Sequence, residues 1–164
     1  MLINEIGGVN IKDDTFAVAP AVKELYRAGG AITVGSAVVM DTAANLGSQV
    51  IIAPAYTADL AGQSANAAFA GIYTGTGGSG AASVIANLVG KAAVAGDMIL
   101  VVQRGLVYGV ANAAIATAGT ALRIGSTSGR MGPITYVADV ASRCNAVALE
   151  TAAGAASVFR MSVQ

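Results

Sequence analysis

Short runs of apolar, often β-branched residues recur along this chain, and glycine-rich or polar segments separate them. Runs of this kind, bounded by Gly, Asn, Asp and Ser, are typical of β-strands. Turn signals return at intervals of about ten residues, which predicts a mainly β fold, a compact antiparallel β-sandwich or barrel-like body with little helix. The segments predicted to contain strands are 31–41, 49–57, 67–74, 97–103, 105–111, 121–126, 133–139 and 156–163.

Residues 1–30 differ from the rest because they combine large aliphatic side chains with a high density of charge. Pro20 stands at the start of PAVKELYRA, and Gly29 follows its end, which predicts a short helical turn. We therefore expect an extended N-terminal arm with a short helical turn over 1–30 and a β-rich body over 31–164. The alternative for the arm is a frayed terminus.

Two parts of the body have weakly similar sequences, which we call the sequence echo. ITVGSAVVMDTA resembles ATAGTALRIGST and aligns Gly35 with Gly119, and a following pair of segments aligns Asn66 with Asn145. The copies lie about 80 positions apart, so one interpretation is two related β-modules over 31–80 and 92–164. The other interpretation is that sequence rich in Ala and Gly aligns with itself by chance.

The composition limits the partners of this chain. Of its 164 residues 55% are hydrophobic and only 11% are charged, with a formal net charge of zero. A nucleic-acid-binding protein would carry a basic face, so this class is not expected. The longest apolar stretch, 82–102, is interrupted by polar and charged residues, so we expect no membrane span. A neutral apolar surface tends to associate, which predicts that other subunits cover part of it.

Side chains that commonly perform catalysis are scarce. The chain has no histidine and one cysteine, Cys144, which is expected to be a small buried side chain. The main acidic residues are scattered along the chain, mostly at turn positions, where carboxylates cap backbone N–H groups, so no metal site or enzyme activity is expected. These main acidic residues are Asp13, Asp14, Asp41, Asp59, Asp97, Asp139 and Glu150.

The loop 75–80, GTGGSG, matches the pattern G-x-G-x-x-G between a predicted strand and a segment that could be helical. Glycines in such a loop let the backbone approach a pyrophosphate at a helix N-terminus. The match lacks a surrounding alternation of strands and helices, and Asp97 stands at the start of the next strand instead of its end. A surface loop is favoured, and a small-ligand or dinucleotide-binding module is the alternative. Antiparallel strands around the loop would argue against that module.

One segment resembles a known family. The segment AVAGDMILVVQRGLVYGVANAAIATAGTALRIGSTSGRMG is similar to the signature of tailed-bacteriophage capsid decoration proteins, also called cement or head-stabilising proteins. The residues that match are Val94, Gly96, Asp97, Gly105, Val107, Gly119, Leu122, Thr127 and Gly129. The ending 148–163 resembles the closing segment of the family, and 71–74 resembles an earlier strand. The similarity covers the chain from Ala31 to its C-terminus.

The resemblance implies a structural virion protein that binds the outer surface of a phage capsid and bridges its capsomers. Its partners would be the major capsid protein and further copies of itself, often as a homotrimer, on the capsid exterior after assembly in the host cytoplasm. No cofactor is implied. Another phage structural component, such as a tail, neck or fibre-base protein, is the alternative. The residues expected to dock the arm on a neighbour are Leu2, Ile3, Ile6, Val9, Ile11 and Phe16.

Overall fold

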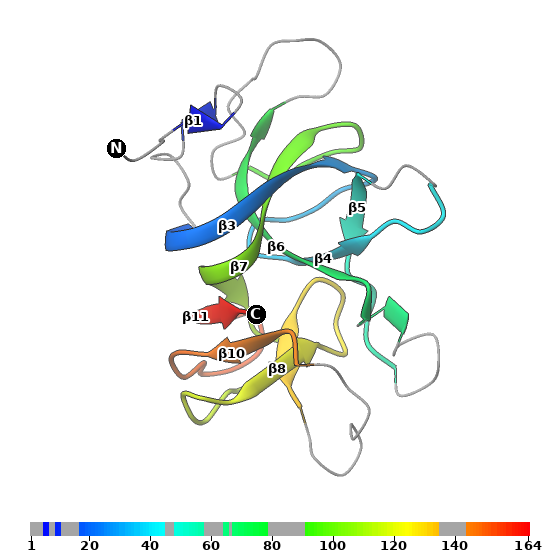
Figure 1. Cartoon of the computed structure of the whole chain (residues 1–164). Coiled ribbons are helices and arrows are strands. Elements are labelled where there is room, and N and C mark those ends of the chain that lie inside the picture. Colours follow the sequence, from blue (N-terminus) through cyan, green and yellow to red (C-terminus); the bar gives the residue numbers. More distant parts are fainter. Residues whose placement is uncertain are drawn as a thin grey trace.

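The computed structural model describes residues 5–6, 9–10, 17–44, 48–57, 64–65, 67–78, 91–134 and 144–164. The described part is mainly β, as the apolar runs predict, and almost all neighbouring strands are antiparallel (Figure 1). The strands are β1 (Glu5–Ile6), β2 (Val9–Asn10), β3 (Ala17–Ala28), β4 (Ala37–Met40), β5 (Gln49–Ile52), β6 (Phe69–Gly78), β7 (Met98–Val110), β8 (Ala121–Ile124), β9 (Met131–Pro133), β10 (Ala146–Ala148) and β11 (Val158–Val163).

The first part of the sheet closes on itself as a small barrel. Its strands follow the order β3-β5-β4-β6-β7, and β7 pairs with β3 to complete the ring. The pairing of β3 with β5 is parallel and limited to Arg27 and Ala28, whereas the pairing of β3 with β7 is antiparallel and long. The side chains buried inside this barrel include Tyr26, Ala28, Val38, Val50, Ala70, Tyr73, Ile99 and Val101.

A second barrel is built on the other half of β7. Strands β7, β11, β10, β8 and β9 follow one another, and a parallel bridge between Ala111 and Met131 brings β9 back to the end of β7. Its interior includes Val107, Leu122, Ile124, Met131, Ala146, Ala148, Phe159, Met161 and Val163. The long strand β7 therefore belongs to both barrels, and Figure 1 shows it curving between them.

A β-bulge explains how one strand serves two barrels. Along β3 the pairing moves from Val22–Arg104 to Lys23–Val102, so Gln103 is an extra residue in β7. An extra residue shifts the alternation of side chains from one face of the strand to the other. Accordingly Val101 is buried in the first barrel, whereas Val107 is buried in the second.

The two barrels have the same internal connections. The pairs β4–β5, β4–β6 and β6–β7 in the first correspond to β8–β9, β8–β10 and β10–β11 in the second, all antiparallel. Gly35 donates its amide to Tyr73 O at 2.8 Å, and Gly119 donates to Ala148 O at 2.7 Å. Gly35 and Gly119, which the sequence echo aligns, thus occupy the same place in two similar units. Asn66 lies outside the described residues.

A common turn precedes five strands of the described part. In each turn the amide of the fourth residue donates to the carbonyl of the first, at 3.1 to 3.4 Å, and the third residue has a positive φ. This is the geometry of a type II turn, which favours glycine at the third position. The turns are 33–36, 94–97, 117–120, 127–130 and 154–157, before β4, β7, β8, β9 and β11.

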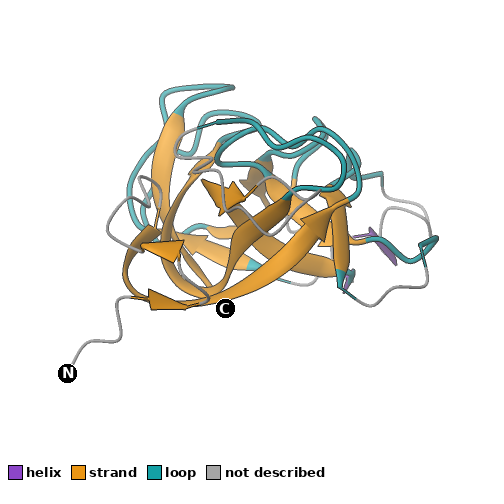
Figure 2. Ribbon diagram, turned by 90° about the horizontal axis from the view of Figure 1, so that it is seen from above, coloured by secondary structure: helices purple, strands orange, loops and turns teal. Residues whose placement is uncertain are grey.

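The barrels pack into one body. Gly129, in the turn between β8 and β9, accepts a hydrogen bond from the amide of Ala37 and donates one to Ala53 O, both at 2.8 Å. The second core also includes Val39 and Ile72, which come from the first barrel. In Figure 2 the strands of both barrels form a continuous body, with loops gathered along one side.

Three sequence expectations need correction. The helical turn predicted from Pro20 is part of strand β3, so residues 17–28 belong to the body and not to an arm. Pairing with β7 from Met98 to Val107 outweighs the helical spacing of apolar residues in this segment. The two strands predicted at 97–103 and 105–111 are the single strand β7. Gly105 does not end the strand but continues it with a φ of 108°.

Candidate functional site

The arm residues predicted to dock on a neighbour are only partly within the described residues. Ile6 and Val9 pair with each other in the β1–β2 ladder. Leu2, Ile3, Ile11 and Phe16 lie outside the described residues. A docking function of the arm therefore stays a prediction from the sequence.

A polar cluster links β3 to β7 at the β-bulge of Gln103. The hydroxyl of Tyr26 donates to Glu24 Oε2 at 2.8 Å, and Gln103 Nε2 donates to the same oxygen at 2.9 Å. Gln103 Nε2 also contacts the Tyr26 hydroxyl. Burial, together with the hydrogen bond to Glu24 and its charge, raises the pKa of Tyr26 to about 12. The phenol therefore stays protonated near neutral pH, where it donates a hydrogen bond and does not act as a base.

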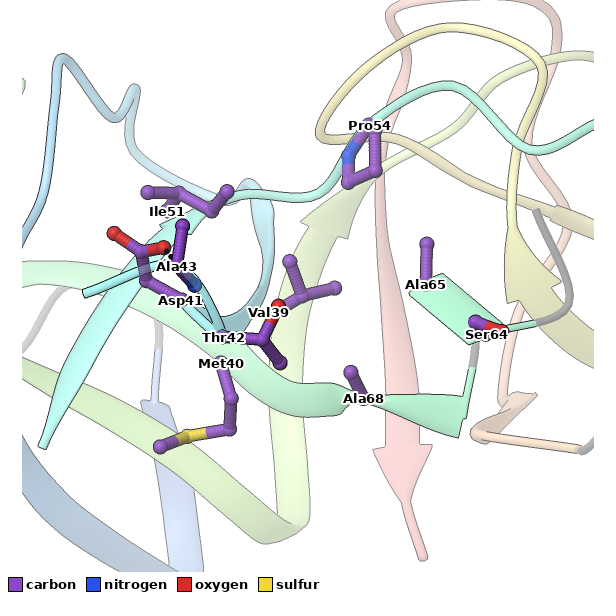
Figure 3. A pocket seen from close by; sticks show the side chains of 10 residues that line it. All are labelled: Val39, Met40, Asp41, Thr42, Ala43, Ile51, Pro54, Ser64, Ala65 and Ala68. Carbon is purple, nitrogen blue, oxygen red and sulfur yellow. Dashed lines mark hydrogen bonds between the residues drawn. The ribbon is translucent and has the colours of Figure 1, made fainter. Parts of the chain in front are cut away.

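A hollow of about 320 Å³ lies beside the end of β4, next to a helical turn at Ser64 and Ala65 (Figure 3). Its wall is mainly apolar. Asp41 is the charged residue of the wall, and its carboxylate accepts hydrogen bonds from the amide of Ala43 at 3.1 Å and from Gln49 Nε2 at 2.7 Å. The carboxylate thus fixes the adjacent turn, and the hollow offers a ligand mostly apolar contacts.

Two further acidic residues, Asp97 and Glu150, also bind the backbone. Asp97 is buried, and its Oδ2 accepts a hydrogen bond from the amide of Val94 at 2.8 Å. Glu150 Oε1 accepts a hydrogen bond from the amide of Arg160 at 2.7 Å. The prediction that Asp41 and Asp97 cap turns is confirmed. Within the part of the chain that the structure describes, no group of three His, Cys, Asp or Glu residues could hold a metal ion. Asp13, Asp14, Asp59 and Asp139 lie outside that part.

Two further side chains, Cys144 and Arg123, carry reactive or charged groups, and both contact neighbouring residues. Cys144 is half-buried, with its Sγ 3.3 Å from Ala146 O. The guanidinium of Arg123 lies 3.7 Å from the centre of the Tyr56 ring, and its Nη1 donates to Ile124 O at 2.7 Å. Such stacking of a cation on an aromatic face stabilises packing. No local sequence pattern indicates this contact, because the two residues lie far apart along the chain.

The glycine-rich loop does not have the surroundings of a dinucleotide site. Gly75–Gly78 belong to β6, and β6 pairs with β7 in the antiparallel direction. A dinucleotide-binding βαβ unit requires two parallel strands joined by a helix. Residues 79–90, including the segment predicted as a helix, lie outside the described residues. The described neighbours of the loop therefore argue against the dinucleotide alternative.

Large apolar side chains are exposed at four described positions, namely Val22, Leu25, Val94 and Val158. Two of the four, Val22 and Leu25, lie on β3 and are 54% and 45% exposed. Val22 also borders a shallow hollow of about 260 Å³ together with Arg104 and Gln164. Sequence analysis missed this surface because it assigned the segment that contains Val22 and Leu25 to a short helical turn.

No helix among the described residues is long and apolar enough to cross a membrane. No family model matches the sequence, and no curated protein matches it either. Among solved structures, the chain is similar to the head fiber gp8.5 N base of bacteriophage phi29. The two chains share 13% identity with a TM-score of 0.47, and the similarity covers 87% of this chain and 93% of the other.

Proposed function

We propose that this chain is a non-enzymatic structural protein of a tailed-phage virion, and that it binds the outer surface of the capsid and stabilises it by bridging capsomers. Its partners are the major capsid protein and further copies of itself. The N-terminal arm provides apolar contacts to a neighbouring subunit. Assembly takes place in the host cytoplasm, where newly formed capsids are present.

The observation that carries the proposal is the place of the residues that resemble the decoration-protein signature. Gly96 and Gly119 are the positive-φ residues of two turns, and Asp97 caps the first of them. Val107 and Leu122 are fully buried in the second core. The residues that carry the resemblance thus lie in turns and in the second core, which supports the proposal.

The surface of the chain supports an assembly function. Only 11% of the residues are charged, the formal net charge is zero, and four large apolar side chains are exposed in the described part. A surface of this kind favours association with other protein surfaces. Because a capsid presents many identical sites, contacts that are weak individually can hold an oligomer firmly.

Binding to capsids that lack the protein tests the proposal. The purified chain is mixed with such capsids, and co-sedimentation is measured for the wild type and two arm variants. Replacing Leu2, Ile3 and Ile6 together by serine should reduce binding at least about tenfold, because each buried aliphatic side chain contributes roughly 1.5 kcal/mol or more. The matched variant with Lys12, Asp13 and Asp14 replaced by serine should bind normally. Wild-type protein that stays in the supernatant refutes the proposal, whereas equal binding by all three refutes only the function of the arm.

A further inference from the structure

One side of strands β7 and β11 points away from the second core. Phe159 and Met161 of β11 are fully buried in that core. Val158 and Arg160 alternate with them along the strand, so they point to the opposite side. Tyr108 of β7 is the cross-strand partner of Arg160, and cross-strand partners lie on the same side of a sheet. An apolar, an aromatic and a cationic side chain are thus neighbours on the outer side of the sheet.

The same side of the sheet continues to β3 at the shallow hollow of about 260 Å³. Arg104 stands four positions before Tyr108 on β7, so the two side chains share one side of the strand. Val22 of β3 is the cross-strand partner of Arg104, and both line the hollow together with Gln103 and Gln164. Val22 and Val158, at the two ends of this surface, are each 54% exposed. We call the surface formed by Val22, Arg104, Tyr108, Val158 and Arg160 the arginine face.

Positive charge is concentrated in the half of the chain that builds most of this face. Residues 98–164 contain five arginines and two acidic residues, whereas residues 1–97 contain four basic and seven acidic residues. Arg104 is exposed. The Nε atom of Arg160 is buried, and none of the described residues accepts a hydrogen bond from it. Because a buried donor without an acceptor is costly, negative charge brought next to this guanidinium is favourable.

The acidic side chains of the chain itself are a poor source of that negative charge. Among the described residues from 17 onward, each acidic side chain accepts a hydrogen bond within the chain, and these residues are Glu24, Asp41, Asp97 and Glu150. Glu150 bonds the backbone amide of Arg160. A second copy would present the same carboxylates, already bonded. Another protein with an acidic surface is therefore the better partner for the arginine face.

We propose that the arginine face is the surface that binds the capsid, and that the capsid presents carboxylate side chains to Arg104 and Arg160. This inference rests on the proposed function and deepens it, because it names the binding surface and the chemistry of the partner. A guanidinium can bind a carboxylate through two parallel hydrogen bonds, and arginine and tyrosine are enriched at the centres of protein interfaces. The exposed valines give apolar contacts around the ion pairs. A nucleic acid would also attract arginines, but the formal net charge of zero favours a protein partner.

Charge reversal on the arginine face tests the position of the binding surface. Arg104→Glu with Arg160→Glu should bind capsids that lack the protein at least about tenfold more weakly than the wild type in co-sedimentation. Arg27→Glu with Lys91→Glu is the matched control, because it changes the net charge equally at two exposed positions outside the face. The control should bind within about twofold of the wild type. Arg104→Gln alone, at an exposed position, should weaken binding about threefold, and circular dichroism confirms that each variant keeps its β structure.

Neutralising the capsid tests the chemistry of the partner. Capsid carboxylates are converted to neutral amides with a carbodiimide and ethanolamine, and electron microscopy confirms that the capsids stay intact. On these capsids the wild type should bind at least about tenfold more weakly, and its advantage over the double variant Arg104→Glu with Arg160→Glu should shrink to less than about twofold.

The outcomes separate this inference from the proposed function. Wild type that does not bind untreated capsids refutes the proposed function and this inference with it. Equal binding by the wild type and the folded double variant, equal weakening by the control, or an advantage that persists on neutralised capsids overturns this inference alone. Binding of the wild type to duplex DNA that needs the same two arginines would assign the face to nucleic acid and overturn it as well.

Discussion

Ala28 and Ala111 accept the same hydrogen bond in the two barrels. The amide of Gly96 donates to Ala28 O at 2.7 Å, and the amide of Ala156 donates to Ala111 O at 2.9 Å. Gly96 and Ala156 are thus equivalent residues, each third in the turn before the last strand of its unit. Both have a positive φ, 93° for Gly96 and 65° for Ala156. In the first unit a glycine adopts this conformation, whereas in the second unit an alanine adopts it.

Exchanging these two residue types should therefore change stability in opposite directions. Ala156→Gly relieves a conformation that costs a non-glycine residue roughly 1 kcal/mol, and part of that gain is lost to the greater freedom of the unfolded chain. We expect the free energy of unfolding to rise by about 0.5 kcal/mol. Gly96→Ala should lower it by about 1 kcal/mol, since the nearest atom of the described residues to its added Cβ is Arg27 Nη2, at 4.0 Å. Urea denaturation measures both changes, and a loss of stability in Ala156→Gly contradicts the equivalence.

Gly129 tests the contact between the two barrels. A Cβ added at Gly129 would lie 2.8 Å from Ile52 Cδ1 and 3.0 Å from Ser36 Oγ, both in the first unit. Its φ is 73°, so Gly129→Ala adds backbone strain to this overlap. We expect a loss of about 2 to 4 kcal/mol in the free energy of unfolding, the sum of strain and overpacking.

Gly119→Ala is the matched control for that substitution. Gly119 has a φ of 89°, but no atom of the described residues lies within 4 Å of its added Cβ, so only backbone strain of about 1 kcal/mol is expected. The difference between the two variants measures the packing of the β8–β9 turn on the first barrel. Equal losses for Gly119→Ala and Gly129→Ala would show that this contact contributes nothing to stability.

Tyr26 should make the stability of the protein depend on pH in the alkaline range. Its pKa is raised to about 12 by burial first, and then by the hydrogen bond to Glu24 and its charge. The fold therefore favours the protonated phenol, so its contribution is fully present below about pH 10, the pKa in the unfolded chain, and is lost between about pH 10 and 12. The loss should be about 2 kcal/mol.

The variant Tyr26→Phe isolates this contribution. Denaturation curves at several alkaline pH values give the free energy of unfolding for both proteins. The other titrating groups affect both proteins alike, so the difference between wild type and variant should shrink as the pH rises through this range. A difference that stays constant with pH would mean that the phenol of Tyr26 ionises as easily in the fold as in the unfolded chain.

The positions of strands and turns were largely accessible from the sequence. Glycines at 35, 96, 119 and 129 mark turns because only glycine adopts a positive φ without strain. The turn before β11 carries Ala156 in that conformation, which no sequence rule would have predicted. That 97–103 and 105–111 form a single strand could not be predicted either. The bulge at Gln103 depends on pairing with β3, a segment distant in the sequence.

The exposed side chains of β3 were harder to predict than the positions of the strands and turns. Val22, Leu25 and Tyr26 have the spacing of one helix face, and Pro20 has the place of a first helical residue. The same residues form a strand because long pairing with β7 outweighs local preference. Only that pairing with a distant segment shows that these residues form a strand, so the exposure of Val22 and Leu25 could not be derived from local pattern.

Surface labelling of intact phage particles tests the central claim, that this protein is on the outside of the capsid. Purified particles are treated with an amine reagent that cannot enter the capsid, and the modified peptides are identified by mass spectrometry. We expect this chain to be present at many copies per particle and to be labelled at lysine, whereas proteins inside the capsid remain unlabelled. Absence of the chain from purified particles, or its presence without any label, would contradict the account.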